Sequence, residues 1–396
     1  MIAKSMAPLL AGASEIRAMF EEGLKLAKVY GKENVYDFCV GNPGLHPPKE
    51  VYEAIDYINH NMDPHLVHGY MPNAGYDSTR QCVADYFNRK YGTDWSLNNI
   101  IMTVGAGSAL CAVMRTVFDP GDKMVVFAPY FVEYANWAYL SGATTVAVPP
   151  NEANGFEPDP AELKKILDPS VKMVIINNPN NPTGVIYSPE TITGIADVLR
   201  EAEAEYGHPI YILADEPYKE LVYTDQVVPF LPDYYDHSII CYSWSKSLSL
   251  PGERIGYVAV PNTMDGFEEF MGALNVANRV ACGTNAPSMM QLIVERCIDA
   301  QVDVPYYKKN GQELYDIVTK AGFTAVVPQG AFYLWVKSPD ENEYDFIKAL
   351  KEERILGVAG SAFKCPGYIR LSFCIANETI QRSAESFYKV GKKYFG

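Results

Sequence analysis

Short apolar segments alternate with helical patterns through the middle of the chain, from about residue 99 to residue 260. Several of these segments are apolar at every position, which is typical of strands that are covered on both faces. Helical patterns separate many of them, such as 189–206, whose N-terminus Ser188 can cap. The alternation therefore predicts an α/β fold with a mostly parallel central sheet flanked by helices. The strands are expected at 100–104, 123–128, 144–148, 172–177, 209–214, 238–242 and 255–260.

The pattern changes in the last third of the chain. A long helical stretch is expected over 286–321, with a kink at Pro305. Two further strands are expected at 324–337 and 368–373. These elements indicate a smaller α+β unit, and the N-terminal segment is expected to pack on it.

The length and composition fit a folded protein of about two to three domains. With 396 residues, of which 48% are hydrophobic and 20% charged, the chain does not have the composition of a disordered protein. We expect a large domain over 48–299 and a small domain formed by 1–47 and 300–396. Because no run of about 18 apolar residues occurs, we expect no membrane span.

The charge and the cysteine pattern limit the partners and the compartment. Lysine and arginine number 33 against 48 acidic residues, a net charge of −15, which argues against nucleic acid or an anionic membrane as the main partner. The eight cysteines include no Cys-x-x-Cys pair, so we expect no zinc or disulfide framework and a cytoplasmic location. Residues 4–13 are a poor signal peptide because Pro8 interrupts a short apolar patch, and none is expected.

Three histidines lie within nine residues, a clustering that raises the question of a metal site. His60, His65 and His68 do not share one helical face, Pro64 breaks the segment, and no cysteine accompanies them. This spacing does not match that of zinc ligands, so we expect no metal.

A lysine, Lys246, lies just beyond the expected strand 238–242. Desolvation of an ammonium group lowers its pKa and makes the amine a nucleophile toward carbonyls. Hydroxyls at Ser243 and Ser245 and the guanidinium of Arg254 would suit a nearby phosphate. An isolated lysine at a strand end is more often a solvated edge residue.

Three other expected strands also end in polar or small residues. One ends in Asp215-Glu216-Pro217-Tyr218, and another runs into the amide-rich turn 177–184. A third enters Gly105-Ala106-Gly107 before a helix, where small residues allow backbone N–H groups to approach an anion. The third segment lacks the last glycine of the dinucleotide fingerprint and is weak evidence alone. Since ligands of α/β sheets bind outside the carboxyl ends of the strands, we expect these residues to meet.

Together, a phosphate cradle, an amide, a carboxylate with a phenol, and a lysine describe a pyridoxal-phosphate site. The chain resembles the class I aminotransferases of fold-type I, nearest to the bacterial aspartate-, alanine- and aromatic-type enzymes. The motifs that carry the resemblance are Asn-Pro-Thr-Gly at 181–184, Asp-x-x-Tyr at 215–218, Ser-x-Ser-Lys at 243–246 and Arg-x-Gly at 254–256. The resemblance implies a small domain that closes over the active site.

The resemblance also implies roles around the cofactor. Lys246 would hold pyridoxal 5′-phosphate as a Schiff base and then act as general base. Asp215 would pair with the pyridine nitrogen, and Tyr218 and Asn181 would hydrogen-bond the phenolate oxygen of the ring. Phe131 and Pro217 would cover the two ring faces, with Phe in place of the Trp common in relatives. The phosphate would be held by Gly105, Ala106, Gly107, Ser243, Ser245 and Arg254.

Further residues are implied for the substrate and for a second subunit. Tyr70 would reach the phosphate of the neighbouring subunit, so the active sites would be shared in a homodimer. Arg370 would grip the substrate α-carboxylate, Asn181 would also contact the substrate, and Gly41 lies in the loop that would touch it. The side-chain pocket is expected to include Ile16, Phe332 and Tyr333, and Arg279 lies near a position where some dicarboxylate-specific relatives place an arginine.

The expected function is transfer of an amino group from an L-amino acid to a 2-oxo acid, with 2-oxoglutarate as acceptor, by a ping-pong mechanism. One alternative on the same fold is a C–S β-lyase, which would release pyruvate and ammonia from cysteine-type substrates. Another is a cofactor-binding or interaction protein without catalysis, against which Lys246, Asp215 and Arg370 argue. The preferred amino donor is left open.

Overall fold

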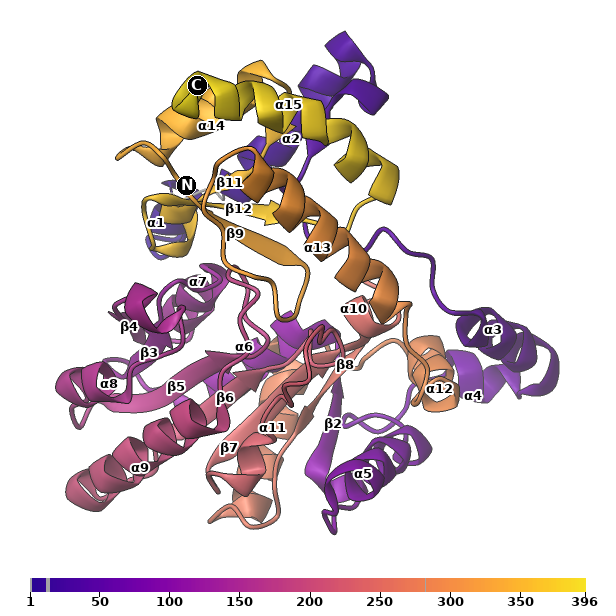
Figure 1. The fold of residues 1–396 in the computed structure, drawn as a ribbon. Coiled ribbons are helices and arrows are strands. Elements are labelled where there is room, and N and C mark those ends of the chain that lie inside the picture. The colour runs from indigo at the N-terminus through magenta and orange to yellow at the C-terminus, as the bar shows by residue number, and fades with distance from the viewer. Residues whose placement is uncertain (1, 12–14, 282) are drawn as a thin grey trace.

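A computed structural model describes residues 2–11, 15–281 and 283–396. Within these residues a seven-stranded sheet has the order β2-β8-β7-β6-β5-β3-β4 (Figure 1). Its strands are β2 (Ile100–Thr103), β3 (Lys123–Phe127), β4 (Thr144–Val148), β5 (Val171–Asn177), β6 (Tyr211–Asp215), β7 (Ser238–Ser243) and β8 (Gly256–Ala259). Strands β4, β3, β5, β6 and β7 pair in parallel, and β8 is antiparallel to β7 and β2. The expected mostly parallel sheet is confirmed, and each of its expected strands is present.

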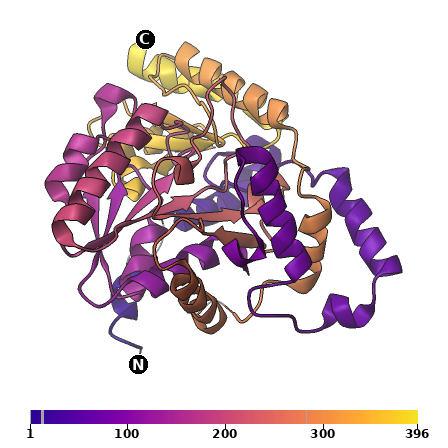
Figure 2. The same cartoon turned by 90° about the horizontal axis from the view of Figure 1, so that it is seen from below.

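Helices cover both faces of this sheet (Figure 2). One face packs against α6 (Gly105–Val117), α7 (Glu133–Leu140) and α11 (Phe267–Ala281). The other packs against α5 (Asp77–Tyr91), α9 (Pro189–Tyr206) and α12 (Ser288–Arg296). Side chains of β7 alternate between the two cores, since Ile239 and Cys241 face one and Ile240 and Tyr242 the other. Apolar residues are therefore needed at every position of such a strand.

The helix α9 has the bounds that the sequence predicts. Pro189 is its first residue, and the Ser188 side chain accepts a hydrogen bond from the backbone N–H of Thr191. Gly207 ends the helix with φ 74°, a left-handed conformation that glycine adopts without strain.

A second, three-stranded antiparallel sheet has the order β11-β12-β9 and consists of β9 (Tyr333–Lys337), β11 (Val358–Ala359) and β12 (Tyr368–Ser372). It packs with α13 (Val304–Lys320), α14 (Glu343–Glu352) and α15 (Asn377–Phe395). Near it, β1 (Tyr36–Asp37) pairs in parallel with β10 (Ile355–Leu356), which joins the N-terminal segment to the C-terminal part. Figure 1 shows this small sheet above the large one, with α10 (Trp244–Ser247) between them.

The remaining elements are short or peripheral. The α-helices are α1 (Met6–Ala11), α2 (Glu15–Tyr30), α3 (Lys49–Asn61), α4 (Pro64–His68) and α8 (Pro160–Ile166). The 3₁₀ helices are η1 (Lys32–Asn34), η2 (Leu97–Asn99), η3 (Glu152–Asn154), η4 (Leu231–Asp233) and η5 (Gly360–Phe363). Among the described helices, none is long and apolar enough to cross a membrane.

Two expectations for the C-terminal third are wrong. Residues 286–321 form two helices rather than one kinked helix, and Pro305 lies in the first turn of α13, where Asp303 caps the N-terminus. The first turn tolerates proline because its missing N–H would have no helical partner there. The strand expected over 324–337 begins at Tyr333. Ala325 instead bridges back onto Val336 in antiparallel fashion, because the segment between them turns.

Candidate active site

The carboxyl ends of several strands meet at one cavity of about 360 Å³. Asn177 ends β5, Asp215 ends β6 and Ser243 ends β7, and these parallel strands end on the same edge of the sheet. On the same edge, α6 begins at Gly105 directly after β2. The cavity is lined by Gly41, Ala106, Gly107, Leu110, Phe131, Trp137, Asn177, Asn181, Asp215, Pro217, Tyr218, Ser243, Ser245, Lys246, Pro251, Arg254, Tyr333 and Arg370.

Lys246 extends into this cavity from the short helix α10. Its Nζ donates a hydrogen bond to the backbone carbonyl of Gly41 at 2.7 Å. Burial, together with the positive charges of Arg254 and Arg370, lowers the pKa of Lys246 to about 8, against the opposing effects of Cys374 and Asp215. A lysine with this pKa is partly neutral near pH 7 to 8, so its amine can attack a carbonyl or take up a proton.

Asp215 has one satisfied and one unsatisfied carboxylate oxygen. Tyr134 donates to Oδ2 at 2.5 Å, and Asn177 Nδ2 lies 3.4 Å from the same oxygen. Oδ1 is buried without a hydrogen-bond partner among the described residues. Burial raises the pKa of Asp215 to about 6, against the hydrogen bond from Tyr134 and the charge of Lys246. A buried carboxylate oxygen in this state calls for a donor from a ligand.

One end of the cavity is built for an anion. The N-terminus of α6, at Gly105, and the buried hydroxyl-bearing residues Ser243 and Ser245 face it together with Arg254. Arg254 Nη1 lies 3.4 Å from Ser245 Oγ, and no described carboxylate is within ion-pair distance of the guanidinium. A Cβ at Gly105 would lie 2.4 Å from Arg254 Nη2, and one at Gly256 would lie 2.2 Å from the Tyr242 carbonyl oxygen. Only glycines therefore leave room for this arrangement.

The same cavity also contains a buried guanidinium. Arg370 is 2% exposed, and its Nη1 and Nη2 donate to Asn181 Oδ1 at 2.9 Å and to the Cys39 carbonyl at 2.6 Å. Among the described residues, its Nε has no hydrogen-bond partner and no carboxylate forms an ion pair with the guanidinium. Because an unpaired buried charge is costly, this guanidinium is suited to an anionic ligand.

Two phenols, those of Tyr218 and Tyr333, also line the cavity. The hydroxyls of Tyr218 and Tyr333 lie 2.8 Å apart. Burial is the main cause that raises the pKa of each, to about 12 for Tyr333. Both hydroxyls are therefore protonated at neutral pH and can serve as hydrogen-bond donors.

The sequence matches one known protein family over most of its length. The family described as aminotransferase class I and II matches residues 33–387. The chain belongs to this family. An aspartate aminotransferase of Pyrococcus horikoshii is 31% identical over 386 residues, which cover 94% of this chain and 93% of that protein.

Two further relatives of this aminotransferase extend the comparison. Aromatic-amino-acid aminotransferase 2 of Thermococcus litoralis is 29% identical over 392 residues, with 96% of each chain covered. The crystal structure of an aminotransferase from Eubacterium rectale matches with a TM-score of 0.97 at 40% identity and covers 100% of both chains. The enzyme is thus a pyridoxal-phosphate-dependent transaminase, and the β-lyase alternative is not favoured.

The cavity of this aminotransferase fits pyridoxal phosphate. The unpaired Asp215 Oδ1 suits a protonated pyridine nitrogen, and the anion end suits a phosphate. The amine of Lys246 lies in the same cavity. These groups match the charge and hydrogen-bonding pattern of the cofactor.

The structure brings most of the sequence-predicted residues of the aminotransferase together. Every predicted residue within the chain's own site lines the cavity, apart from Gly105, which lies next to Arg254. Tyr70 is not among them, because its side chain is 96% exposed. Of the expected side-chain pocket, Tyr333 lines the cavity, Phe332 lies behind it against Tyr218, and Arg279 is exposed on α11. The Ile16 side chain lies outside the part of the chain that the structure describes.

Sequence reasoning missed several contributors to the aminotransferase site. Tyr134 lies on α7 and hydrogen-bonds Asp215, but nothing in its local sequence distinguishes it from other buried aromatic residues. Asn177 belongs to the amide-rich turn, from which the motif selected only Asn181. Trp137 follows Phe131 by less than two helical turns and also lines the cavity. No described group of three His, Cys, Asp or Glu residues is arranged to hold a metal ion.

Proposed function

We propose that this aminotransferase takes the amino group of an L-amino acid and passes it to 2-oxoglutarate in a ping-pong mechanism. The observation that carries the proposal is that Arg370 and Lys246 line the same cavity. Arg370 supplies an unpaired buried guanidinium for a carboxylate, and Lys246 supplies an amine with a pKa of about 8. Every α-amino acid and 2-oxo acid carries the carboxylate that such a guanidinium binds in a fork geometry.

Bound pyridoxal phosphate supplies an electron sink for negative charge at the substrate Cα. We assign two roles to Lys246. Its amine would hold the carbonyl carbon of pyridoxal phosphate, and it would move the proton between that carbon and the substrate Cα. The lowered pKa keeps part of the Lys246 amine neutral near neutral pH, so that the amine can accept the proton. Asp215 would hold a proton on the pyridine nitrogen, with Tyr134 fixing the orientation of its carboxylate.

The remaining polar groups would orient the ring and the phosphate. Tyr218 and Asn181 line the cavity where they could donate to the ring oxygen. Phe131 and Pro217 are assigned to the two ring faces. The phosphate is assigned to the start of α6 at 105–107, with Ser243, Ser245 and Arg254.

The substrate α-carboxylate is assigned to Arg370. The Asn181 and Cys39 contacts hold two of its nitrogens and leave Nε unpaired. Gly41 lines the same cavity, and a Cβ there would lie 2.3 Å from Tyr333 Oη. A side chain at position 41 would therefore displace Tyr333 or the backbone that faces the substrate.

We further propose that the enzyme is a homodimer whose subunits share active sites. Tyr70, at 96% exposed, is free to reach a second subunit, and it follows the helices α3 and α4, which project from the body (Figures 1 and 2). Tyr52, Tyr57 and Leu66 on these helices are also exposed. Exposed apolar side chains concentrated on one projection are typical of an interaction surface.

The proposed domain division places 48–299 in a large domain and 1–47 with 300–396 in a small domain. The pairing of β1 with β10 supports it, because this pairing joins the N-terminal segment to the C-terminal part. We also propose a cytoplasmic location. The described cysteines are free thiols, which fits a reducing compartment.

The test is an absorption spectrum of the purified holoenzyme, recorded before and after addition of a panel of L-amino acids. We expect an amino donor to remove the yellow band of the bound cofactor and 2-oxoglutarate to restore it. The donor with the fastest change identifies the substrate class. A band that persists while cysteine-type substrates release ammonia would instead establish the lyase reaction.

A further inference from the structure

Tyr333 contacts both Arg370 and Tyr218, two residues of the proposed active site. It is the first residue of β9, which pairs with β12, and its ring lies 4.5 Å from the Arg370 guanidinium. Its hydroxyl lies 2.8 Å from that of Tyr218, which follows β6 of the large sheet. One side chain of the small sheet therefore touches the proposed carboxylate-binding arginine and the proposed donor to the cofactor.

The Tyr333 hydroxyl has little freedom to turn away. The residue is 3% exposed, and its ring packs at 81° against the ring of Tyr218 and at 63° against that of Phe332. On another side the hydroxyl abuts Gly41, since a Cβ there would come within 2.3 Å of Oη. The hydrogen bond between the two phenols is thus fixed by packing around both rings.

The number of hydroxyl protons determines which tyrosine donates the hydrogen bond between Tyr218 and Tyr333 when the cofactor is bound. Each phenol has one proton, so Tyr218 can donate either to Tyr333 or into the cavity, but not to both. If Tyr218 donates to the ring oxygen of the cofactor, Tyr333 must be the donor between the two hydroxyls. We propose that Tyr333 is a positioning residue that donates its proton to Tyr218 and thereby directs the proton of Tyr218 toward the cofactor. This inference rests on the proposed function and adds a residue to it.

The surrounding charges favour this direction. Burial raises the pKa of Tyr333, but the Arg370 guanidinium against its ring opposes the rise. A nearby positive charge stabilises the phenolate form and makes the phenol a stronger hydrogen-bond donor. A Tyr218 hydroxyl that accepts this bond becomes a stronger donor in turn, because hydrogen bonds in a chain polarise one another.

The test is a pH titration of the absorption spectrum of the bound cofactor in wild-type and Tyr333→Phe holoenzymes. Phenylalanine keeps the ring against Arg370 and removes only the hydroxyl. Tyr218 then donates more weakly to the ring oxygen of the cofactor. The ring oxygen keeps more negative charge, so the titrating proton of the chromophore, which lies next to this oxygen, is held more tightly. We expect the pKa of the chromophore to rise by about 0.5 to 1, kcat to fall by about three- to tenfold, and KM to stay within about threefold.

Two further variants separate positioning from packing. In a Tyr218→Phe background, Tyr333→Phe should leave the chromophore pKa unchanged, since the effect of Tyr333 passes through Tyr218. Tyr306→Phe is the matched control, because it removes a phenol hydroxyl of α13 that contacts the backbone N–H of Asn377 at 3.0 Å. This control should titrate like the wild type.

Other results overturn the inference. A Tyr333→Phe enzyme with a wild-type chromophore pKa, or an equal rise in the Tyr218→Phe background, would show that Tyr333 does not act through Tyr218. A wild-type protein that binds no cofactor, or whose cofactor band no amino acid changes, would overturn the proposed function itself and this inference with it.

Discussion

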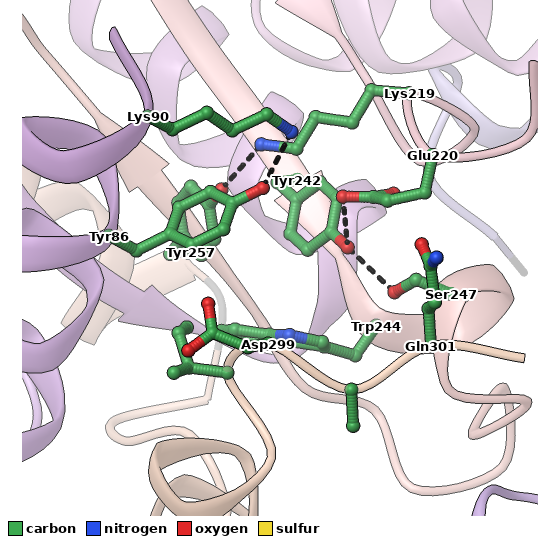
Figure 3. Close-up of a pocket in the computed structure, with 12 residues that line it drawn as sticks. Tyr86, Lys90, Lys219, Glu220, Tyr242, Trp244, Ser247, Tyr257, Asp299 and Gln301 are labelled. Carbon is green, nitrogen blue, oxygen red and sulfur yellow. Dashed lines mark hydrogen bonds between the residues drawn. The ribbon is translucent and has the colours of Figure 1, made fainter. Parts of the chain in front are cut away.

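Two lysines on adjacent strand ends, Lys246 after β7 and Lys219 after β6, have opposite pKa shifts. The pKa of Lys246 is lowered to about 8, whereas that of Lys219 is raised above 10.5, although burial opposes the charged form of both. Lys246 lines the catalytic cavity. Lys219 lines a separate cavity of about 250 Å³, which Figure 3 shows.

The surroundings of Lys219 stabilise its charge. The side chain is 7% exposed and donates to Tyr257 Oη at 3.1 Å. Its ammonium lies 4.4 Å from the ring centroid of Tyr242 and 5.1 to 5.8 Å from those of Phe87, Tyr86 and Tyr257. The carboxylates of Glu216 and Glu220 raise its pKa. Aromatic faces and carboxylates therefore replace the water that this ammonium has lost.

Lys246 has a different set of neighbours. Its amine faces a carbonyl oxygen, and the charges of two arginines, Arg254 and Arg370, add to the cost of protonation. Burial alone therefore does not make a lysine reactive. The charges around the buried amine decide whether it is a fixed cation or a usable base.

The largest expected effect is the loss of turnover in Lys246→Met. We expect kcat to fall by about 10³-fold or more, because the amine that holds the cofactor and moves the proton is gone. Lys219→Met should keep kcat within about threefold on its folded fraction, since Lys219 faces the other cavity. The measurement is steady-state amino transfer with cofactor in excess. A Lys246→Met rate within tenfold of the wild type would contradict the assignment.

The second prediction concerns the unpaired guanidinium. Arg370→Ala should raise KM for every amino donor by about 10²- to 10³-fold, because a buried charge-assisted contact to the common α-carboxylate is lost. The measurement is KM across acidic, aromatic and small amino acids. An effect confined to aspartate would place Arg370 in the side-chain pocket instead.

The third prediction is a stability change at Lys219. Lys219→Met removes the cation that most stabilises the charged forms of Glu216 and Glu220 and leaves only the weaker effect of Lys90, so we expect the free energy of unfolding at pH 8 to fall by about 3 kcal/mol. Burial raises the pKa of Glu216 to about 7, so at pH 5 this group is neutral and the loss should be smaller. Urea unfolding at both pH values checks this.

Lys164→Met is the control for this stability change, because its exposed side chain pairs with Glu201 at 2.6 Å. It should leave the free energy of unfolding nearly unchanged, because water and salt screen an exposed ion pair. Equal losses in Lys164→Met and Lys219→Met would show that the aromatic and acidic surroundings of Lys219 contribute nothing.

The sequence identifies Lys246 as a candidate residue, but it does not reveal how the pKa values of the two lysines differ. Lys246 was found because it stands within a compact motif, with Ser243 and Ser245 beside it and Arg254 eight residues further on. The strands were found for a similar reason, since a strand covered on both faces is a continuous apolar run. Features carried by neighbours in the chain were therefore predictable.

Contacts between distant residues were not predictable in this way. Tyr134 meets Asp215 across 81 positions and Tyr218 meets Tyr333 across 115, and no local pattern links either pair. The aromatic surroundings of Lys219 likewise come from α5, β7 and β8. The pKa of a buried group depends on such contacts, so the sequence could identify a candidate lysine but not the direction of its shift.

The smallest expected effect is a change in the free energy of unfolding of Lys246→Met, and its sign is opposite to that expected for Lys219→Met. With the cofactor removed, Lys246→Met should be more stable than the wild type at pH 7, by about 1 to 2 kcal/mol. The folded pKa of Lys246 is about 8 against 10.5 for the unfolded chain, so the unfolded state binds more protons between these values. Wild-type stability should therefore rise with pH over that range, and the advantage of the variant should vanish near pH 10.5.

Urea unfolding of both cofactor-free proteins at pH 7 and pH 10 measures this. If Lys246→Met is instead destabilised at pH 7, as Lys219→Met is expected to be, both lysines are structural cations and the contrast drawn from their neighbours is wrong.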